Sequence, residues 1–176
     1  TTPDLERDLV PVRIPVDKNL GGYCVFLIRA PDQPRFAAIR TLDELRNVSI
    51  GLGLGWIDVS ILQSSRFDVV TGSSYDGLFR MAVNRRFDGF LRASVEVLDE
   101  LEARKQELPE LVIEDTLILY YQLPMYFWFS KTAAGERLAE RVREGMLGMI
   151  EDGTYESKPG RLSKVDGVQH TDTHIA

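Results

Sequence analysis

The segment Gly51-Leu52-Gly53-Leu54-Gly55 places small residues directly before the aromatic Trp56. Small residues let backbone N–H groups approach an anion or a zwitterion, and Trp56 would then form an apolar wall of the site. An equally good interpretation is a tight turn in which Trp56 is buried. A dinucleotide fingerprint fits less well, because the third glycine falls one residue early. Gly55 and Trp56 are therefore candidate ligand contacts.

Polar residues that follow expected strands are further candidates. Ser73 and Ser74 carry hydroxyl groups that can contact a ligand, although helix capping, with Asp76 three residues after Ser73, is favoured. Arg92 follows an apolar segment, and its guanidinium can hold a carboxylate through paired hydrogen bonds. The alternative is a surface arginine that pairs with Glu96, four residues later.

Asp88 and the two histidines are the remaining residues with catalytic or metal-binding chemistry. Asp88 lies among apolar residues and is the best acid/base candidate, although a buried structural aspartate is favoured. His170 and His174 have the i, i+4 spacing of a helical metal pair, but no helical pattern surrounds them and no Glu separates them. We therefore expect no metal site, no cofactor and no Ser-His-Asp triad.

Strands that alternate with helices would position these residues. We expect strands over residues 23–28, 48–50, 67–70, 86–91, 111–113, 117–121 and 126–129. We expect helices from residue 41, from 57, from about 74 to 83, from 95 to before 109, and from about 134 to 152, where Gly153 fits the cap. This alternation predicts an α/β fold with a parallel or mixed sheet, whose ligands bind beyond the carboxyl ends of the strands. The loops 53–57, 72–75 and 92–94 lie at those ends.

The composition is that of a folded globular chain. The 176 residues are 44% hydrophobic and 27% charged, which fits one domain or two small ones. The net charge of -6 without a basic cluster does not favour nucleic acid or an anionic membrane as a partner. No segment approaches the roughly 18 apolar residues of a membrane span. The single Cys24 cannot form an internal disulfide. The sequence starts at Thr1 without a leader, which leaves the location of the protein open.

Four short motifs follow one another along the chain: Thr2-Pro3-Asp4-Leu5-Glu6-Arg7, Thr41-Leu42-Asp43-Glu44-Leu45, Arg86-Phe87-Asp88-Gly89-Phe90 and Tyr126-Phe127-Trp128-Phe129-Ser130-Lys131. Their order, over about residues 1–156, resembles that of type II periplasmic solute-binding proteins. The most similar branch is that of the polar amino-acid-binding proteins of bacterial ABC importers.

The resemblance implies a periplasmic-binding-protein type II-like α/β fold, with two lobes of mixed sheets joined by two crossing strands. The crossing, or hinge, strands would be residues 23–30 and 124–130, with lobe 2 over 31–123 and a flexible tail over 157–176. Residues 1–22 and 131–156 would form only part of lobe 1, because family members carry a further stretch before the segment that matches Thr1. The chain therefore looks truncated, and we expect a homodimer through the incomplete lobe.

The resemblance also implies a binding site. Arg7 corresponds to the family's carboxylate-binding arginine, and Thr2 to the hydroxyl residue before it, whereas the sequence by itself indicates only a solvated charge at Arg7. The family commonly places hydroxyl residues where this chain has Trp56 and Ile57. Its ammonium-binding aspartate would lie near Arg92, where no acidic residue stands. Arg92 would then be a second anion-binding group for a ligand with two acidic ends or without an amine.

The expected function is a non-catalytic solute-binding module that closes on a small anionic or amino-acid-like ligand between its lobes. By resemblance, its partner is the membrane permease of an ABC importer and its location is the periplasm. One alternative is the ligand-sensing domain of a signalling receptor on the same scaffold. A less favoured alternative is a dehydratase-type enzyme, for which Asp88 would have to serve as the cleft carboxylate.

Overall fold

The computed structural model describes residues 3–157 and 172–174 and divides the chain into two compact units. Of the described residues, unit 1 comprises 3–22 and 122–157, and unit 2 comprises 23–121 and 172–174. The chain therefore passes from one unit to the other after Gly22 and again after Tyr121.

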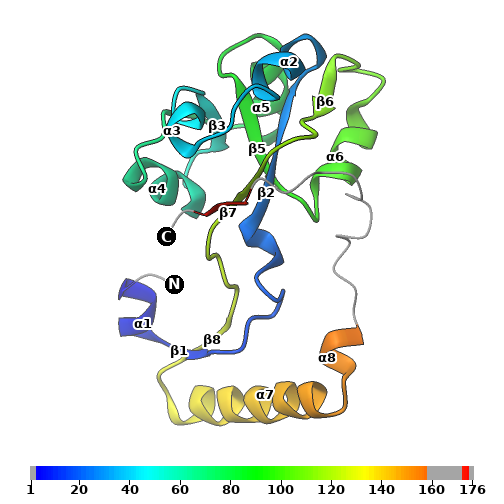
Figure 1. Cartoon of the computed structure of the whole chain (residues 1–176). Helices are drawn as coiled ribbons and strands as arrows, with labels where there is room; N and C mark the ends of the chain where they lie inside the picture. Colours follow the sequence, from blue (N-terminus) through cyan, green and yellow to red (C-terminus); the bar gives the residue numbers. More distant parts are fainter. Residues whose placement is uncertain (1–2, 158–171, 175–176) are drawn as a thin grey trace. The chain divides into compact units, whose positions relative to one another are not determined.

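Unit 2 is built on a mixed sheet (Figure 1). Its strands are β2 (Tyr23–Arg29), β3 (Ile50–Gly53), β4 (Val69–Gly72), β5 (Gly89–Ala93), β6 (Leu111–Ile113), β7 (Ile118–Tyr120) and β9 (Asp172–His174). Over the described residues their order is β4-β3-β5-β2-β7-β9, with β6 also paired to β2. β3 is parallel to β4 and β5, whereas β2 is antiparallel to β5, β6 and β7. The expected α/β fold with a mixed sheet is confirmed.

Short helices connect these strands. They are the 3-10 helix η2 (Ala30–Asp32) and the α-helices α2 (Gln33–Phe36), α3 (Leu42–Leu45), α4 (Ile57–Ser64), α5 (Tyr75–Val83) and α6 (Val97–Arg104). The expected capping box at α3 is confirmed, because Thr41 and Glu44 each accept a hydrogen bond from the other's backbone N–H. The capping box expected between Ser73 and Asp76 is wrong by one residue: Ser74 caps α5 and accepts a hydrogen bond from the Gly77 N–H at 3.1 Å.

The core of unit 2 lies around β2, which is buried along almost its whole length. Val25 and Leu27 of β2 belong to one cluster with Phe79 of α5 and Phe90 of β5, and all four are fully buried. Elements pack against both sides of such a strand, which explains why its sequence is continuously apolar rather than alternating. Each of these side chains contributes about 1.5–3 kcal/mol through burial.

Unit 1 has fewer elements. They are α1 (Pro3–Asp8), β1 (Leu9–Val12), the 3-10 helix η1 (Leu20–Gly22), β8 (Phe127–Ser130), α7 (Ala133–Glu151) and α8 (Thr154–Ser157). β1 and β8 form a two-stranded antiparallel sheet in which Pro11 lies opposite the half-buried Trp128. α7 packs Ala139 and Met146 against Val12 of β1.

Local chemistry fixes both ends of α7. Thr132 accepts a hydrogen bond from the Gly135 N–H at 3.2 Å at the start of the helix. A Cβ at Gly135 would overlap the backbone of Ser130, so only glycine permits this close approach of helix and strand. Gly153, with φ of 78°, follows the last turn, as its expected capping role requires.

Several element boundaries differ from the sequence-based expectation. Gly51 and Gly53 lie within β3 rather than in a turn, and the strand expected from residue 86 begins at Gly89. The expected tail over 157–176 lies mostly outside the described residues, and residues 172–174 form β9 parallel to β7. Of the two expected hinge segments, β2 belongs to the sheet of unit 2 and β8 pairs within unit 1, so their hinge role stays a prediction. No described helix has the length and apolar character needed to cross a membrane.

Candidate ligand-binding site

The carboxyl ends of β3, β4 and β5 meet at one edge of the unit 2 sheet. The three strands run parallel, and their register places Gly53 opposite Gly72 at the ends of β3 and β4. The loops that begin at Leu54, Ser73 and Ser94 therefore leave the sheet on the same side. This is the edge at which the sequence predicts ligand contacts.

The glycines before Trp56 are explained by packing and by a turn. A Cβ at Gly51 would overlap the Phe87 ring, and a Cβ at Gly53 would overlap the Trp56 ring. Gly55 adopts a φ of 83°, which disfavours other residues. Trp56 thus folds back over β3, where its ring stacks with Phe90 at a centroid distance of 6.3 Å. The tight turn is therefore present with Trp56 half-buried, and the role of Trp56 as a wall of the ligand site stays a prediction.

The second loop offers the exposed hydroxyl of Ser73 at the edge. Ser74 is occupied as the cap of α5, and Ser73, one position earlier, is exposed to solvent. In the first loop Gly55 is exposed and Leu54 is 68% exposed. The structure therefore places Gly55 and Ser73 at the solvent-facing side of the edge, whereas Trp56 lies beneath it.

Arg92 is buried, with only 8% of its surface exposed. Its Nη2 donates a hydrogen bond to Glu96 at 2.7 Å, and its Nε donates one to Glu100 at 2.7 Å. Burial disfavours the charged guanidinium, but the hydrogen bonds and charge of Glu100 outweigh it and raise the pKa of Arg92 above its ordinary value. The pairing with Glu96 that the sequence left open is present, and Glu100 is a second partner.

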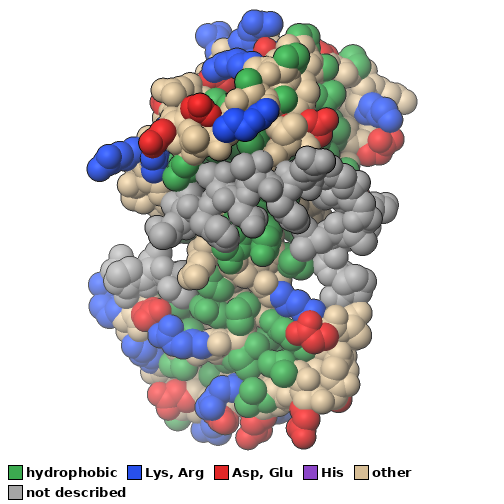
Figure 2. All heavy atoms as spheres, viewed as in Figure 1, with side chains coloured by type: hydrophobic (Ala, Val, Ile, Leu, Met, Phe, Trp, Pro, Cys, Tyr) green, Lys and Arg blue, Asp and Glu red, His purple; other side chains and the backbone are tan. Residues whose placement is uncertain are grey.

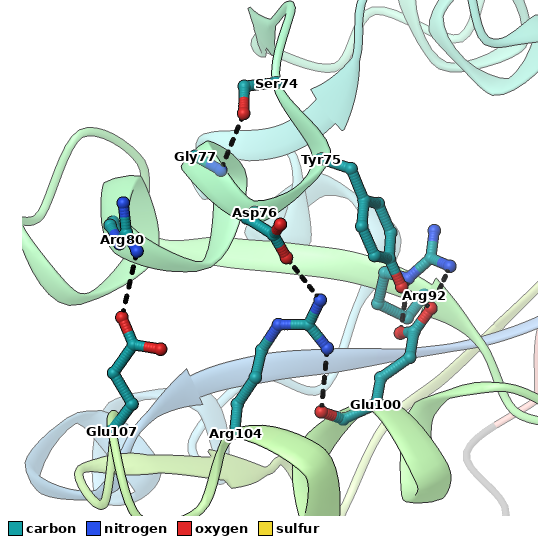
Figure 3. A network of polar contacts seen from close by, with 9 residues as sticks. All are labelled: Ser74, Tyr75, Asp76, Gly77, Arg80, Arg92, Glu100, Arg104 and Glu107. Carbon is teal, nitrogen blue, oxygen red and sulfur yellow. Dashed lines mark hydrogen bonds and ion pairs between the residues drawn. The ribbon is translucent and has the colours of Figure 1, made fainter.

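Glu100 joins Arg92 to a larger polar network between α5 and α6 (Figure 3). The Tyr75 hydroxyl also donates to Glu100, and burial together with this carboxylate raises the pKa of Tyr75 to about 12. Arg104 donates to the Glu100 carbonyl at 3.1 Å and pairs with Asp76 at 2.6 Å. Sequence reasoning missed these contacts, although the four-residue spacing of Glu96, Glu100 and Arg104 on one helix face is a usable signal.

A groove of about 260 Å³ lies beside this network. Its lining residues are Asp76, Arg80, Ala103, Arg104, Glu107 and Leu108. Its four charged side chains form two ion pairs, Arg104 with Asp76 at 2.6 Å and Arg80 with Glu107 at 3.0 Å. The groove therefore holds balanced charges and gives no reason to expect an ion there.

Arg7 lies at the end of α1 in unit 1, with 67% of its side chain exposed. Its Nε and Nη2 donate to the two carboxylate oxygens of Asp8 at 2.8 and 2.9 Å, and this pairing holds the pKa of Asp8 below its ordinary value. Lys131 donates to the backbone carbonyls of Glu6 and Arg7 at 2.9 and 2.6 Å, which fixes the carboxyl end of α1. Thr2 lies outside the described residues.

Asp88 occupies the opposite edge of the sheet, immediately before β5. It accepts hydrogen bonds from the Ser49 N–H and hydroxyl, both at 2.9 Å, and pairs with Arg35 at 2.5 Å. Burial raises the pKa of Asp88, but the donors from Arg35 and Ser49 outweigh it and hold the pKa below the ordinary value. Asp88 is thus the hydrogen-bonded structural aspartate that the sequence favours.

Metal-binding clusters are absent from the part of the chain that the structure describes. Of the two histidines with the spacing of a metal pair, His170 lies outside the described residues. His174 lies in β9, and its side chain is not described.

The sequence did not predict a buried polar contact in unit 2 among Cys24, Asp58 and Tyr121. The Tyr121 hydroxyl donates to Asp58 in the first turn of α4 and accepts a hydrogen bond from the Cys24 thiol at 3.4 Å. Burial raises the pKa of Cys24 to about 12, so the thiol stays neutral. Tyr121 is the last residue of unit 2 before the chain enters unit 1. The contact therefore ties the start of α4 to the end of the unit.

No protein-family model and no curated protein matches the sequence, but solved structures match the fold. An amino acid ABC transporter substrate-binding protein from Streptococcus pneumoniae, bound to L-arginine, matches 97% of this chain and 65% of its own, with a TM-score of 0.61 and 14% identity. An arginine 3rd transport system periplasmic binding protein from Legionella pneumophila matches 88% and 65%, with a TM-score of 0.59 and 16% identity. The chain has the type II periplasmic-binding-protein fold.

This fold occurs in proteins with different roles. The GluR0 ligand-binding core from Nostoc punctiforme, in complex with L-glutamate, matches 89% of this chain and 66% of its own, with a TM-score of 0.56 and 14% identity. The chain spans about 65% of the length of the Streptococcus and Legionella proteins. The expected type II fold is confirmed. A shared fold does not transfer the ligands of these proteins to this chain.

Proposed function

We propose that this chain acts as an extracytoplasmic solute-binding component of an ABC-type importer. The observation that carries the proposal is the convergence of three loops at the carboxyl edge of β3, β4 and β5 within a type II periplasmic-binding-protein fold. Ligands of α/β sheets bind at such edges. The proposed location is the periplasm, and the proposed partner is a membrane permease. No cofactor is required for this role.

The proposed ligand is a small anionic or amino-acid-like molecule with a carboxylate. Arg7 and Thr2 are its proposed contacts in unit 1, and Gly55 and Ser73 in unit 2. Arg7 supports this role because its side chain is 67% exposed and its pair with Asp8 is a surface pair of small energy, so a ligand carboxylate can take over the same two donors. The proposal requires both units to contact one ligand.

Trp56 and Arg92 take a different part in the proposal. Arg92 is already paired with two carboxylates, and Trp56 is packed against Phe90, so both support the edge from within. This favours a ligand with one carboxylate over one with two acidic ends, because Arg7 is then the single proposed cation at the ligand.

Calorimetric titration of the full chain with amino acids, monocarboxylates and dicarboxylates tests this function. We expect Arg7→Ala to weaken binding of the best ligand about 10- to 100-fold, the value of a charge-assisted pair of hydrogen bonds. Arg13→Ala is the matched control, because Arg13 is also an exposed arginine of unit 1, paired with Glu6 at 3.0 Å. Equal binding by the two variants would remove Arg7 from the site, and no binding by the unmodified chain would contradict the proposed function.

Self-association is a further part of the proposal. Leu138, Leu147 and Ile150 of α7 are each more than 40% exposed, and an apolar surface of this kind supports a homodimer through unit 1. Light scattering of the purified chain measures its mass directly.

The ligand-sensing domain of a signalling receptor is the second candidate. The match to the GluR0 ligand-binding core supports it. A transmembrane segment that adjoins this domain in the full gene would favour the receptor over the importer. A dehydratase-type enzyme is less favoured, because the carboxylate on which it would depend, Asp88, is held by Arg35 and Ser49 at the opposite edge of the sheet.

A further inference from the structure

The Arg92 guanidinium lies among aromatic rings. Its central carbon lies 4.8 Å from the centroid of the Trp56 ring, 5.4 Å from that of Phe90 and 5.7 Å from that of Tyr75. A guanidinium within about 6 Å of a ring centroid is attracted by the ring quadrupole, and more strongly when water is excluded. Arg92 is therefore surrounded by three such attractions at once.

Two carboxylates complete its surroundings. Glu96 and Glu100 both accept hydrogen bonds from Arg92. Glu100, which Figure 3 shows beside Arg92, uses both of its oxygens. Two negative charges against one positive charge leave this group with an excess of one negative charge. Paired carboxylate oxygens and ring faces together match the planar, five-donor guanidinium better than the compact ammonium.

The contacts of Arg92 come from all three elements that follow the parallel strands. Trp56 lies in the loop after β3, Tyr75 begins α5 after β4, and Glu100 lies on α6 after β5. Arg92 itself belongs to β5. A single side chain thus contacts the segment that follows each of the three parallel strands at this edge.

We propose that Trp56, Tyr75, Glu96 and Glu100 form a guanidinium-binding cage whose occupant is the chain's own Arg92. By filling the cage, Arg92 sets the positions of the three loops and acts as a positioning residue rather than as a ligand contact. An external guanidinium occupies the cage once the Arg92 side chain is removed. Solvent reaches it because the Glu96 side chain is 56% exposed and Tyr75 is 42% exposed. Only the link to ligand binding rests on the proposed function.

The test uses the full chain with Arg92→Ala and methylguanidinium as the probe. We expect the thermal unfolding midpoint of the variant to fall by about 5 °C or more, because Glu96 and Glu100 lose their shared cation. Millimolar methylguanidinium should raise the midpoint again, whereas the neutral methylurea of the same shape should not. The unmodified chain should not respond, because its cage is filled. An equal response to both compounds, or none, would overturn the proposal.

Arg80→Ala is the matched control. Arg80 pairs with Glu107 at 3.0 Å in the same network, but both side chains are more than 60% exposed. Removal of this arginine should shift the midpoint little, and methylguanidinium should not raise it. If methylguanidinium raised the midpoint of Arg80→Ala as much as that of Arg92→Ala, the effect would not come from the cage and the proposal would fail.

Arg92→Lys covers the case in which Arg92→Ala does not fold. Lysine keeps the positive charge but lacks the planar set of donors of the guanidinium. We therefore expect a partial fall in the thermal unfolding midpoint and faster amide exchange in the loops at 54–56, 73–75 and 94–96. Unchanged midpoint and exchange would overturn the proposal, as would faster exchange confined to one loop. Refolding of Arg92→Ala only with methylguanidinium would support it.

These measurements need no transported ligand. Recovery by methylguanidinium together with failed carboxylate binding would leave the cage established and contradict only the importer role. Intact carboxylate binding without recovery by methylguanidinium would contradict the cage and leave the importer role in place.

Discussion

The two units bury their hydrophobic residues to very different extents. Unit 2 has a continuous core around β2, with fully buried side chains contributed by strands and by α5. In unit 1, the described core cluster has only Val12, Ala139 and Met146 as buried members. The chain therefore specifies unit 2 by its own packing, whereas unit 1 gains little stability from its interior.

The architecture of unit 1 accounts for the difference. Two strands with one long helix leave most of the apolar side chains half-buried, and isolated two-stranded sheets are marginal in water. Figure 2 shows hydrophobic side chains at the surface of this unit among charged ones. The two units consequently respond differently to the same chemical change, which the following substitutions test.

Phe90→Ala should have the largest effect on stability. Phe90 is fully buried and its ring contacts those of Trp56, Phe79 and Phe87, so its removal should lower the free energy of unfolding by about 3–5 kcal/mol. Urea denaturation measures this. Phe127→Ala, in β8 of unit 1, is the matched control and should cost less than about 1 kcal/mol, because Phe127 is 44% exposed. Similar losses for both would contradict the comparison.

Asp88→Asn tests the polar anchor of unit 2. Loss of the pair with Arg35, which is half exposed, should cost about 1.5 kcal/mol at neutral pH. The folded-state pKa of Asp88 lies below the ordinary value, so its contribution is complete above about pH 4 and disappears as the pH falls through the folded pKa. Denaturation of both proteins at pH 7 and in acid should therefore converge at low pH. Asp43→Asn, at an 88% exposed position, should show neither effect.

Val12→Ala removes the central buried side chain of unit 1. We expect a loss of about 1 kcal/mol, because the truncation removes two methyl groups from a cluster that has few other buried members. Amide exchange in α7 should accelerate while β2 and β5 stay protected. Equal acceleration in β2 would show that the units unfold together and that the contrast between them has no consequence for stability.

Leu147→Lys should change the free energy of unfolding by less than about 0.5 kcal/mol, because Leu147 is 51% exposed. It should nevertheless reduce self-association of the chain, as measured by light scattering over a concentration series. Leu54→Lys places the same change on unit 2 and should leave the association unaltered. If the two variants associate alike, α7 is not the surface through which copies meet.

The sequence was sufficient where local chemistry decides the structure. The apolar run from Tyr23 predicted β2, and the spacing of Thr41 and Glu44 predicted the start of α3. It was insufficient at two turns that lack the usual residue signal. Arg66 and Arg85 adopt positive φ values of 66° and 57° in the turns after α4 and α5, and no glycine marks these turns.

The site shows the same limit. The sequence indicated the loops at Gly55 and Ser73 and the pairing of Arg92 with Glu96. It left two orientations of Trp56 open, because the choice depends on the space that Gly53 leaves and on Phe90 in another strand. The residue type determines which interactions a side chain can make, but the packing of neighbouring strands determines the direction in which it points.

The chain carries two tryptophans, and they fall in different units: Trp56 stacks beneath the edge of unit 2, and Trp128 lies half-buried in β8 of unit 1. Each unit therefore has its own intrinsic fluorophore. Replacement of one indole by phenylalanine leaves an emission signal that reports a single unit, so the melting of each half can be followed in the intact chain without an attached dye.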